Sequence, residues 1–186
     1  KKNIFKKYKK NYKIDDIDAN GIQKLFNARL PEANSEISDT VKGIIFPVFV
    51  LERINIDDEL VSDYSFMVFP IFRGLEGCIK EIFFKFGINI GNNIGGQFQD
   101  HTNSGQFALI EKVKNQINNN VAELVLNKLY NYHKTNRHGI FHVDDTIITT
   151  RIIEDKKVAQ SLINETFELI EMCYIAYKNN DVKILK

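Results

Sequence analysis

The chain of 186 residues is long enough for one domain with a hydrophobic core. Its hydrophobic fraction of 44% and charged fraction of 26% are typical of a globular protein. No apolar run approaches the ~20 residues of a membrane-spanning helix, and no signal peptide is predicted, so we expect a cytoplasmic protein without a membrane partner. Cys78 and Cys173 lie in apolar helical patterns and are predicted to be buried, reduced thiols. No histidine or cysteine spacing indicates a metal site.

The net charge of +1 conceals an uneven distribution along the chain. Residues 1–13 contain seven lysines and no acidic residue, whereas the rest of the chain carries 18 basic and 24 acidic residues. A lysine-rich arm with interspersed aromatic residues is typical of RNA-binding tails. Charged runs are also typical of solvated linkers, here one that leads in from an upstream domain. Both interpretations of the arm stay open.

The predicted elements are helices. The first is expected over residues 15–30 and ends before Pro31, and the second is expected over residues 35–53 with a break at Pro47. No proline occurs in the last 116 residues, which suits long helices.

The third predicted helix has the clearest pattern. Its apolar residues recur every three or four positions and form one stripe, made of Val61, Tyr64, Val68, Ile71, Leu75, Ile79, Ile82 and Phe86. Asp57 and Asp58 favour a start close by, and Gly87 is placed to end the helix.

The segment 87–105 is rich in glycine and asparagine, has no periodicity and is predicted to be a long loop. A fourth helix, weakened at residues 118–120, is predicted from a face made of Ile110, Val113, Ile117, Val121 and Leu124. The pattern is then interrupted around residues 136–145, and a last helix is expected over residues 155–179. These elements predict an all-α bundle.

The third helix also carries a polar row. Arg73, Glu76 and Lys80 are spaced by three and four residues and therefore align on one side. Gly74 and Gly77 flank Glu76, although each glycine costs a helix about 1 kcal/mol relative to alanine. This cost indicates the close approach of a helix, a partner subunit or a ligand to this face. A surface ion pair beside two tolerated glycines is the alternative.

A second polar group, Arg137 and His142, lies in the stretch TNRHGIFHVDDT. Histidine titrates near neutrality and can move protons, and arginine can grip phosphate oxygens and neutralise their charge. These are the groups that RNA cleavage needs when the nucleophile is the 2′-hydroxyl. On an ideal helix the two residues lie ~140° apart. Convergence therefore requires a bend at Gly139 or a motif at a helix start.

The other three histidines are weaker candidates than His142. His138 is the nearer competitor for a role in the motif, because it directly follows Arg137. His133 and His101 are interpreted as surface or loop histidines.

The hexapeptide RHGIFH, residues 137–142, fits the Arg-x4–6-His signature of HEPN-domain ribonucleases. Residues 137–174 resemble the C-terminal region of the RnlA-type toxins of this family (RNase LS type), and residues 66–88 resemble their upstream active-site helix. The resemblance covers roughly residues 60–178, with its two blocks in the expected order.

The resemblance implies a HEPN-type helical bundle that forms a homodimer. It further implies a metal-independent, cofactor-free endoribonuclease toxin of a toxin–antitoxin, antiphage system, with mRNA as substrate and a cognate antitoxin as protein partner. The catalytic residues that it implies are Arg73, Glu76, Arg137 and His142. Weaker candidates for RNA binding are Lys80 and His138. Asp144 replaces the tyrosine of HEPN proteins paired with nucleotidyltransferase antitoxins, which argues against that subgroup.

Two units are expected along the chain. Residues 1–55 form the basic arm and N-terminal helices, either the remnant of an upstream domain or part of the bundle, and residues 56–186 form the HEPN domain. Full-length members of the group carry additional N-terminal domains. The alternative function is therefore a HEPN dimerisation and antitoxin-binding module with little activity in isolation. An effector activated by a cyclic oligonucleotide would need a sensor domain, for which the chain has little room.

Overall fold

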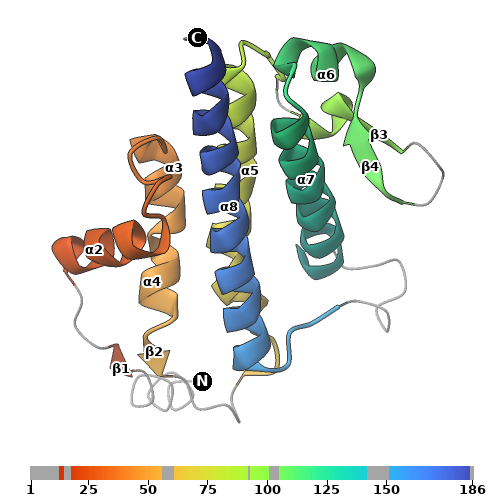
Figure 1. The fold of residues 1–186 in the computed structure, drawn as a ribbon. Coiled ribbons are helices and arrows are strands. Elements are labelled where there is room, and N and C mark those ends of the chain that lie inside the picture. The colour runs from red at the N-terminus through yellow and green to blue at the C-terminus, as the bar shows by residue number, and fades with distance from the viewer. Residues whose placement is uncertain are drawn as a thin grey trace.

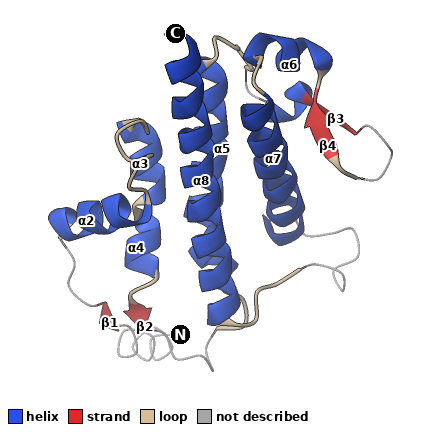
Figure 2. Cartoon of the chain, viewed as in Figure 1, coloured by secondary structure: helices blue, strands red, loops and turns tan. Residues whose placement is uncertain are grey.

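The computed structural model describes residues 13–14, 18–55, 61–91, 93–100, 105–141 and 151–184. The helices in these ranges are α2 (Ala19–Arg29), α3 (Asp39–Ile45), α4 (Pro47–Leu51), α5 (Ser65–Lys85), α6 (Glu111–Ile117), α7 (Asn120–Phe141) and α8 (Lys156–Ile184), with a 3₁₀ helix η2 (Ile94–Gln97). Two short antiparallel ribbons pair β1 (Lys13–Ile14) with β2 (Ile54–Asn55), and β3 (Phe98–Asp100) with β4 (Phe107–Leu109). The predicted all-α architecture is confirmed (Figures 1 and 2). None of the helices in these ranges has the length and hydropathy needed to cross a bilayer.

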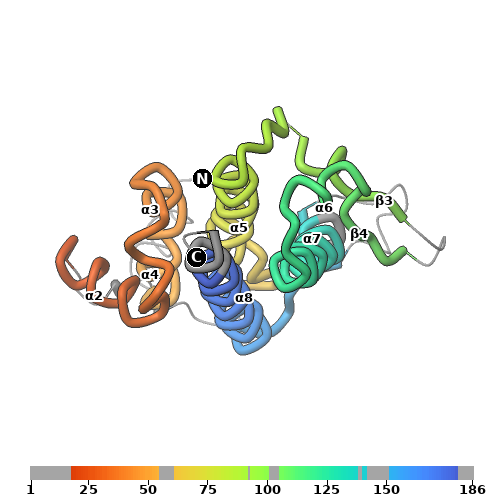
Figure 3. Tube along the Cα trace, turned by 45° about the horizontal axis from the view of Figure 1, so that its top comes forward, coloured from red at the N-terminus to blue at the C-terminus, as the bar shows by residue number. Residues whose placement is uncertain are grey.

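The helices α5 and α8 lie side by side at the centre of the bundle. Helices α3 and α4 lie on one flank of this pair and α7 on the other (Figures 1 and 3). One continuous cluster of buried apolar side chains joins all these elements, from Phe26 in α2 and Phe49 in α4 to Tyr174 in α8. The break predicted at Pro47 is confirmed, because α3 ends and α4 begins there.

The ends of α5 are fixed by local contacts. The carboxylate of Asp63 accepts hydrogen bonds from the backbone N–H (2.9 Å) and the hydroxyl (2.7 Å) of Ser65, and also from the N–H of Ile153 (3.1 Å). The acidic residue that starts α5 is therefore Asp63, whereas residues 57–58 lie outside the described residues. Gly87 ends the helix as predicted, with a left-handed φ of 70°.

The two glycines of α5 face α3. A Cβ atom on Gly74 would overlap Cγ1 of Ile45, and one on Gly77 would lie 2.8 Å from Cγ2 of Val41. The close approach predicted from these glycines is confirmed, and the approaching element is a helix. The face is different from the predicted one, since Glu76 points to α7 and not to α3.

The fourth predicted helix is two helices. Asn118 adopts a left-handed conformation with φ of 46° and ends α6, and the Asn119 side chain accepts the N–H of Val121 (2.8 Å) at the start of α7. The break resets the helical register. As a result, Val121 and Leu124 are 57% and 69% exposed instead of continuing the apolar face. The prediction of one continuous face was wrong.

The C-terminal helices are longer than predicted. Helix α7 continues without interruption to Phe141, so the break expected around residue 136 is wrong for the described part of this stretch. Helix α8 begins at Lys156, close to the predicted start, and continues to Ile184. Cys78 and Cys173 are buried free thiols, as predicted, and burial raises the pKa of both.

The segment predicted as a loop between α5 and α6 contains η2 and the β3–β4 ribbon. Side chains of α7 bind the backbone of β4. Asn131 accepts the N–H of Phe107 (2.8 Å) and donates to its carbonyl (2.7 Å), and Asn127 accepts the N–H of Leu109 (2.8 Å). These amides take the place of a further strand along β4. They attach the ribbon and η2 to α7.

Candidate active site

Glu76 is the centre of a charged cluster between α5 and α7. Its carboxylate lies 2.9 Å from Nζ of Lys80, one turn further along α5. Across the helix interface it lies 3.7 Å from Nη2 of Arg137 and 3.9 Å from Nε2 of His133. His133 and Arg137 are one turn apart on α7, so a row of two residues on each helix faces the other. The fold thus brings together polar positions that are about sixty residues apart in sequence.

The Glu76 carboxyl is shifted toward its ionised form. Burial by itself raises its pKa, but the hydrogen bond from Lys80 and the positive charges of Lys80, Arg137 and His133 outweigh burial and lower the net pKa. Glu76 is therefore ionised at neutral pH. Such a carboxylate is suited to hold a guanidinium in place and poorly suited to exchange a proton near pH 7.

A cleft of about 270 Å³ opens beside this cluster. Its walls combine aromatic rings and charged groups from both helices: Phe69, Phe72, Arg73, Glu76, Arg137 and Phe141. The Arg73 guanidinium lies 5.7 Å from the centre of the Phe69 ring. Within the part of the chain that the structure describes, Arg73 has no acidic partner. Two guanidinium groups, one held by a carboxylate and one beside an aromatic ring, therefore face one cleft, an arrangement that can bind a phosphate.

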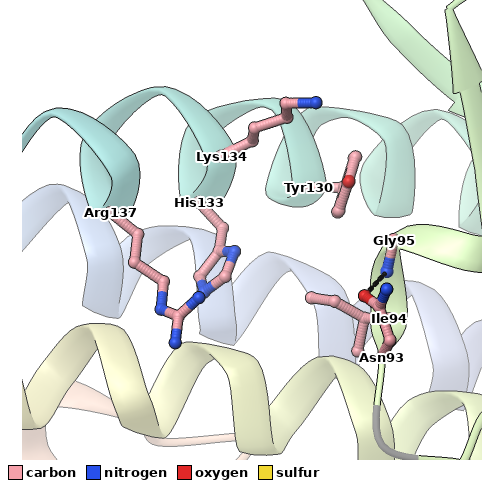
Figure 4. Close-up of a pocket in the computed structure, with 7 residues that line it drawn as sticks. All are labelled: Asn93, Ile94, Gly95, Tyr130, His133, Lys134 and Arg137. Atoms are coloured by element: carbon pink, nitrogen blue, oxygen red, sulfur yellow. Dashed lines mark hydrogen bonds between the residues drawn. The ribbon is translucent and has the colours of Figure 1, made fainter. Parts of the chain in front are cut away.

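Arg137 also lines a second cavity, of about 90 Å³. The residues around it are Asn93, Ile94, Gly95, Tyr130, His133, Lys134 and Arg137. Figure 4 shows His133 and Arg137 extending from α7 toward α5, while Asn93, Ile94 and Gly95 lie across from Tyr130. The Arg137 side chain thus stands between the two cavities.

The structure brings together three of the predicted catalytic residues. Arg73, Glu76 and Arg137 line the same cleft. Lys80 is bound to Glu76 but does not line the cleft. Among the described residues, no group of three or more histidine, cysteine, aspartate or glutamate side chains is arranged to hold a metal ion.

His142, the predicted proton-transfer residue, lies outside the described residues, as does the side chain of His138. Arg137 lies near the C-terminal end of α7, which ends at Phe141, and the negative end of the helix dipole favours a cation there. The motif therefore lies at a helix end. Of the two ways in which Arg137 and His142 were expected to converge, a helix start is excluded.

The prediction of a surface or loop position for His133 is wrong, because His133 is 4% exposed and faces Glu76. A signal for this position exists in the sequence, because His133 follows Leu126, Leu129 and Tyr130 in the buried stripe of α7. His101, interpreted in the same way, lies outside the described residues.

Comparisons with known proteins point to one family. The family described as RnaseLS-like HEPN matches residues 35–161. The mRNA endoribonuclease LsoA of Escherichia coli O157:H7 is 28% identical over 171 residues, which cover 91% of this chain and 47% of LsoA. The crystal structure of the Escherichia coli toxin LsoA in complex with the T4 phage antitoxin Dmd matches with a TM-score of 0.71 and 25% identity. That match covers 84% of this chain and 60% of the matched one.

The chain spans about half the length of this curated relative. The family match covers most of the chain and includes the cleft residues Arg73, Glu76 and Arg137. Fold and sequence therefore lead to the same conclusion, and the resemblance seen in the sequence is confirmed. This chain belongs to the RnaseLS-like HEPN family.

Proposed function

We propose that the chain is an endoribonuclease toxin that cleaves mRNA without a metal ion or cofactor. The observation that carries this proposal is the cleft that Arg73 and Arg137 both line, with Glu76 3.7 Å from the Arg137 guanidinium. A relative described as an mRNA endoribonuclease supports it. The toxin would belong to a toxin–antitoxin, antiphage system and act in the cytoplasm.

In this proposal the two guanidinium groups act on the scissile phosphate. Arg137 and Arg73 bind its non-bridging oxygens and neutralise the charge that builds up as the phosphorus is attacked. Glu76 holds Arg137 in position. Lys80 and His138 are weaker candidates for RNA contacts, and the ion pair of Lys80 with Glu76 makes it a support of the anchor.

His142 moves the proton. The RNA 2′-oxygen loses its proton and forms a bond to phosphorus, the bond to the 5′-oxygen of the next nucleotide breaks, and that oxygen gains a proton. His142 acts as general base or general acid in this exchange. The products are a 2′,3′-cyclic phosphate and a 5′-hydroxyl. DNA is expected to resist because it lacks the 2′-hydroxyl.

The alternative function is a homodimerisation and antitoxin-binding module with little activity of its own. One observation favours it, because the matched structure holds toxin LsoA together with an antitoxin. A homodimer and a cognate antitoxin are partners that both proposals share.

We also propose that residues 19–55 fold as part of the bundle, and are not the remnant of a separate domain. The contacts of Ile45 and Val41 with the glycines of α5 support this, as does the shared core. Most of the basic arm, residues 1–12, lies outside the described residues.

The direct test is RNA cleavage by the purified chain in the presence of a chelator, with analysis of the product ends. We expect cyclic phosphate ends, and a rate for His142→Ala that is lower by about 100-fold or more, the usual contribution of general acid–base catalysis. Equal rates for His142→Ala and the parent chain contradict the mechanism. An intact RNA combined with tight antitoxin binding supports the alternative.

A further inference from the structure

We propose that the cavity between η2 and α7 binds an unpaired nucleobase of the RNA strand whose phosphate lies in the cleft of Arg73 and Arg137. This inference rests on the proposed function and deepens it. Residues outside both the 137–142 motif and the cleft, above all Tyr130 and Gly95, would then select which RNA base is bound.

The hydroxyl of Tyr130 is the first observation. Tyr130 is 7% exposed and lines the cavity, yet its hydroxyl has no hydrogen-bond partner among the residues that the structure describes. Its ring cannot easily turn away, because it is stacked on Phe98 at 3.9 Å with an interplanar angle of 3° and meets Phe107 edge-on at 5.7 Å. The side chain as a whole is buried, but its oxygen is not among the fully enclosed polar atoms, so it opens into the cavity. A fixed, unpartnered hydroxyl in a cavity wall is therefore a group prepared for a ligand.

The opposite wall is shaped around this hydroxyl. A Cβ atom on Gly95 would lie 3.1 Å from the Tyr130 oxygen and 3.0 Å from Oδ1 of Asn93. Oδ1 of Asn93 accepts the N–H of Gly95 at 2.8 Å, which fixes the amide and leaves its Nδ2 group to donate. Asparagine amides and tyrosine hydroxyls read the hydrogen-bonding edges of bases. The glycine keeps the space between them open.

The charge of the lining suits a nucleic acid strand. Among the described residues, no carboxylate lines the cavity, whereas Lys134 and Arg137 both do. Each cation also contacts a residue that does not line the cavity. Nζ of Lys134 lies 3.5 Å from the centre of the Phe107 ring, and Arg137 forms an ion pair with Glu76. Cations in such positions attract the phosphate backbone independently of sequence.

The size and interior of the cavity favour a base over a second phosphate. The volume of about 90 Å³ is several times the ~10–15 Å³ that one water molecule needs, so a planar group of several atoms has room. Besides the cations Lys134 and Arg137, the lining holds neutral groups. The Tyr130 hydroxyl and the Asn93 amide can pair with the edge of a base, and buried Ile94 can pack against its ring.

One RNA strand can reach both the cleft and the cavity. Arg137 borders both, and Tyr130 lies seven residues before it on α7, which is about 10 Å along a helix. A strand that places one phosphate beside Arg137 can therefore place a neighbouring base against Tyr130.

The test is the binding of short single-stranded RNAs of one base type each, with 2′-O-methyl groups that prevent cleavage, measured by fluorescence polarisation. The full chain is compared with Tyr130→Phe and Gly95→Ala. The matched controls are Tyr132→Phe, whose hydroxyl bonds to α8 instead, and Gly96→Ala, where a Cβ meets nothing within 4 Å. Thermal unfolding shows that each variant is folded.

We expect the parent to discriminate between bases, and both cavity variants to lose about fivefold of the affinity ratio between the best and the worst RNA, the usual effect of one hydrogen bond. The controls keep the parental ratio. A parental ratio in Tyr130→Phe and Gly95→Ala, or no discrimination by the parent, overturns the base site. Cleavage of unmodified RNA is read separately. Base discrimination without cleavage supports the base site and contradicts the proposed function.

Discussion

The two sides of α5 are built in opposite ways. Toward α3, Gly74 and Gly77 remove side-chain bulk, so that Ile45 and Val41 pack directly on the helix backbone. Toward α7, Glu76 keeps a charged side chain that reaches the cations of the neighbouring helix. Positions 74, 76 and 77 are nearly adjacent in sequence, yet one side is apolar and closely packed and the other is polar and open to a cleft.

The closely packed side of α5 supports the charged side that faces α7. The glycine contacts set the position of α5 against α3, and the row of charged residues then meets α7 at a defined distance. Side chains held by a packed scaffold keep the geometry that binding and catalysis require. The consequences of substitution should therefore differ, with loss of stability on the glycine side and loss of activity on the charged side.

The largest effect is expected from Arg137→Ala. Removing a group that stabilises developing charge typically lowers the rate by about 100-fold or more. Arg137→Lys should recover only part of the rate, because lysine cannot form a bidentate contact with the phosphate. Initial rates of RNA cleavage measure both. Lys178→Ala, which removes a surface cation on α8 paired with Glu32, is the control and should cleave like the parent. Equal rates for Arg137→Ala and Lys178→Ala would contradict the assignment.

On the other side of α5, Gly74→Ala should cost stability. The added methyl group overlaps Ile45, and overpacking of a core typically costs about 1–3 kcal/mol. Urea unfolding of the folded chain measures the free energy of unfolding. A Gly74→Ala variant as stable as the parent would show that α3 moves freely away from α5. The scaffold argument would then fail.

A smaller effect is expected for the pH dependence of stability through Glu76. Its pKa is lowered in the folded protein, so its ionised form stabilises the fold above the usual glutamate pKa, and this stability is lost as the pH falls through the folded value. Glu76→Gln should remove this contribution, about 1 kcal/mol or less, and flatten the acid side of the profile. Unfolding free energies at several pH values, with Glu168→Gln on the exposed side of α8 as control, measure it. An unchanged acid slope in Glu76→Gln argues against the ion pairs.

The smallest effect is expected at Gly43 of α3, where an added Cβ meets nothing within 4 Å. Gly43→Ala should raise the free energy of unfolding by up to about 1 kcal/mol, because alanine is the better helix former. This variant separates the packing role of Gly74 from the general cost of a helical glycine. A loss of stability in Gly43→Ala would remove that distinction.

The sequence predicted most of the central helices because their faces repeat strictly. Val68, Ile71, Leu75 and Ile79 are buried as the spacing of α5 indicated. The same spacing failed at Val121, since a single left-handed residue, Asn118, separates two helices and shifts their register. Hydrophobic periodicity carries no information on such a break. The asparagine contacts that attach β4 to α7 are likewise tertiary, and three-residue strands are too short to show alternation.

The residue types of the site could be predicted from the sequence, but their neighbours in space could not. Arg73, Glu76 and Arg137 were predicted from spacing and resemblance, and they line one cleft. The spacing of His133 after Leu126, Leu129 and Tyr130 places it on the buried side of α7, but the sequence alone could not show that Glu76 of α5 lies opposite it. The cavity at Tyr130 depends on the approach of η2, which local sequence does not encode.

The most direct test of the central claim is a crystal structure of the chain with a short RNA that carries a 2′-O-methyl group at the cleaved position. The account predicts a phosphate between the guanidinium groups of Arg73 and Arg137, with Glu76 still bound to Arg137. An RNA bound with its phosphates away from this cleft, for example along the asparagines of α7 beside β4, would contradict it.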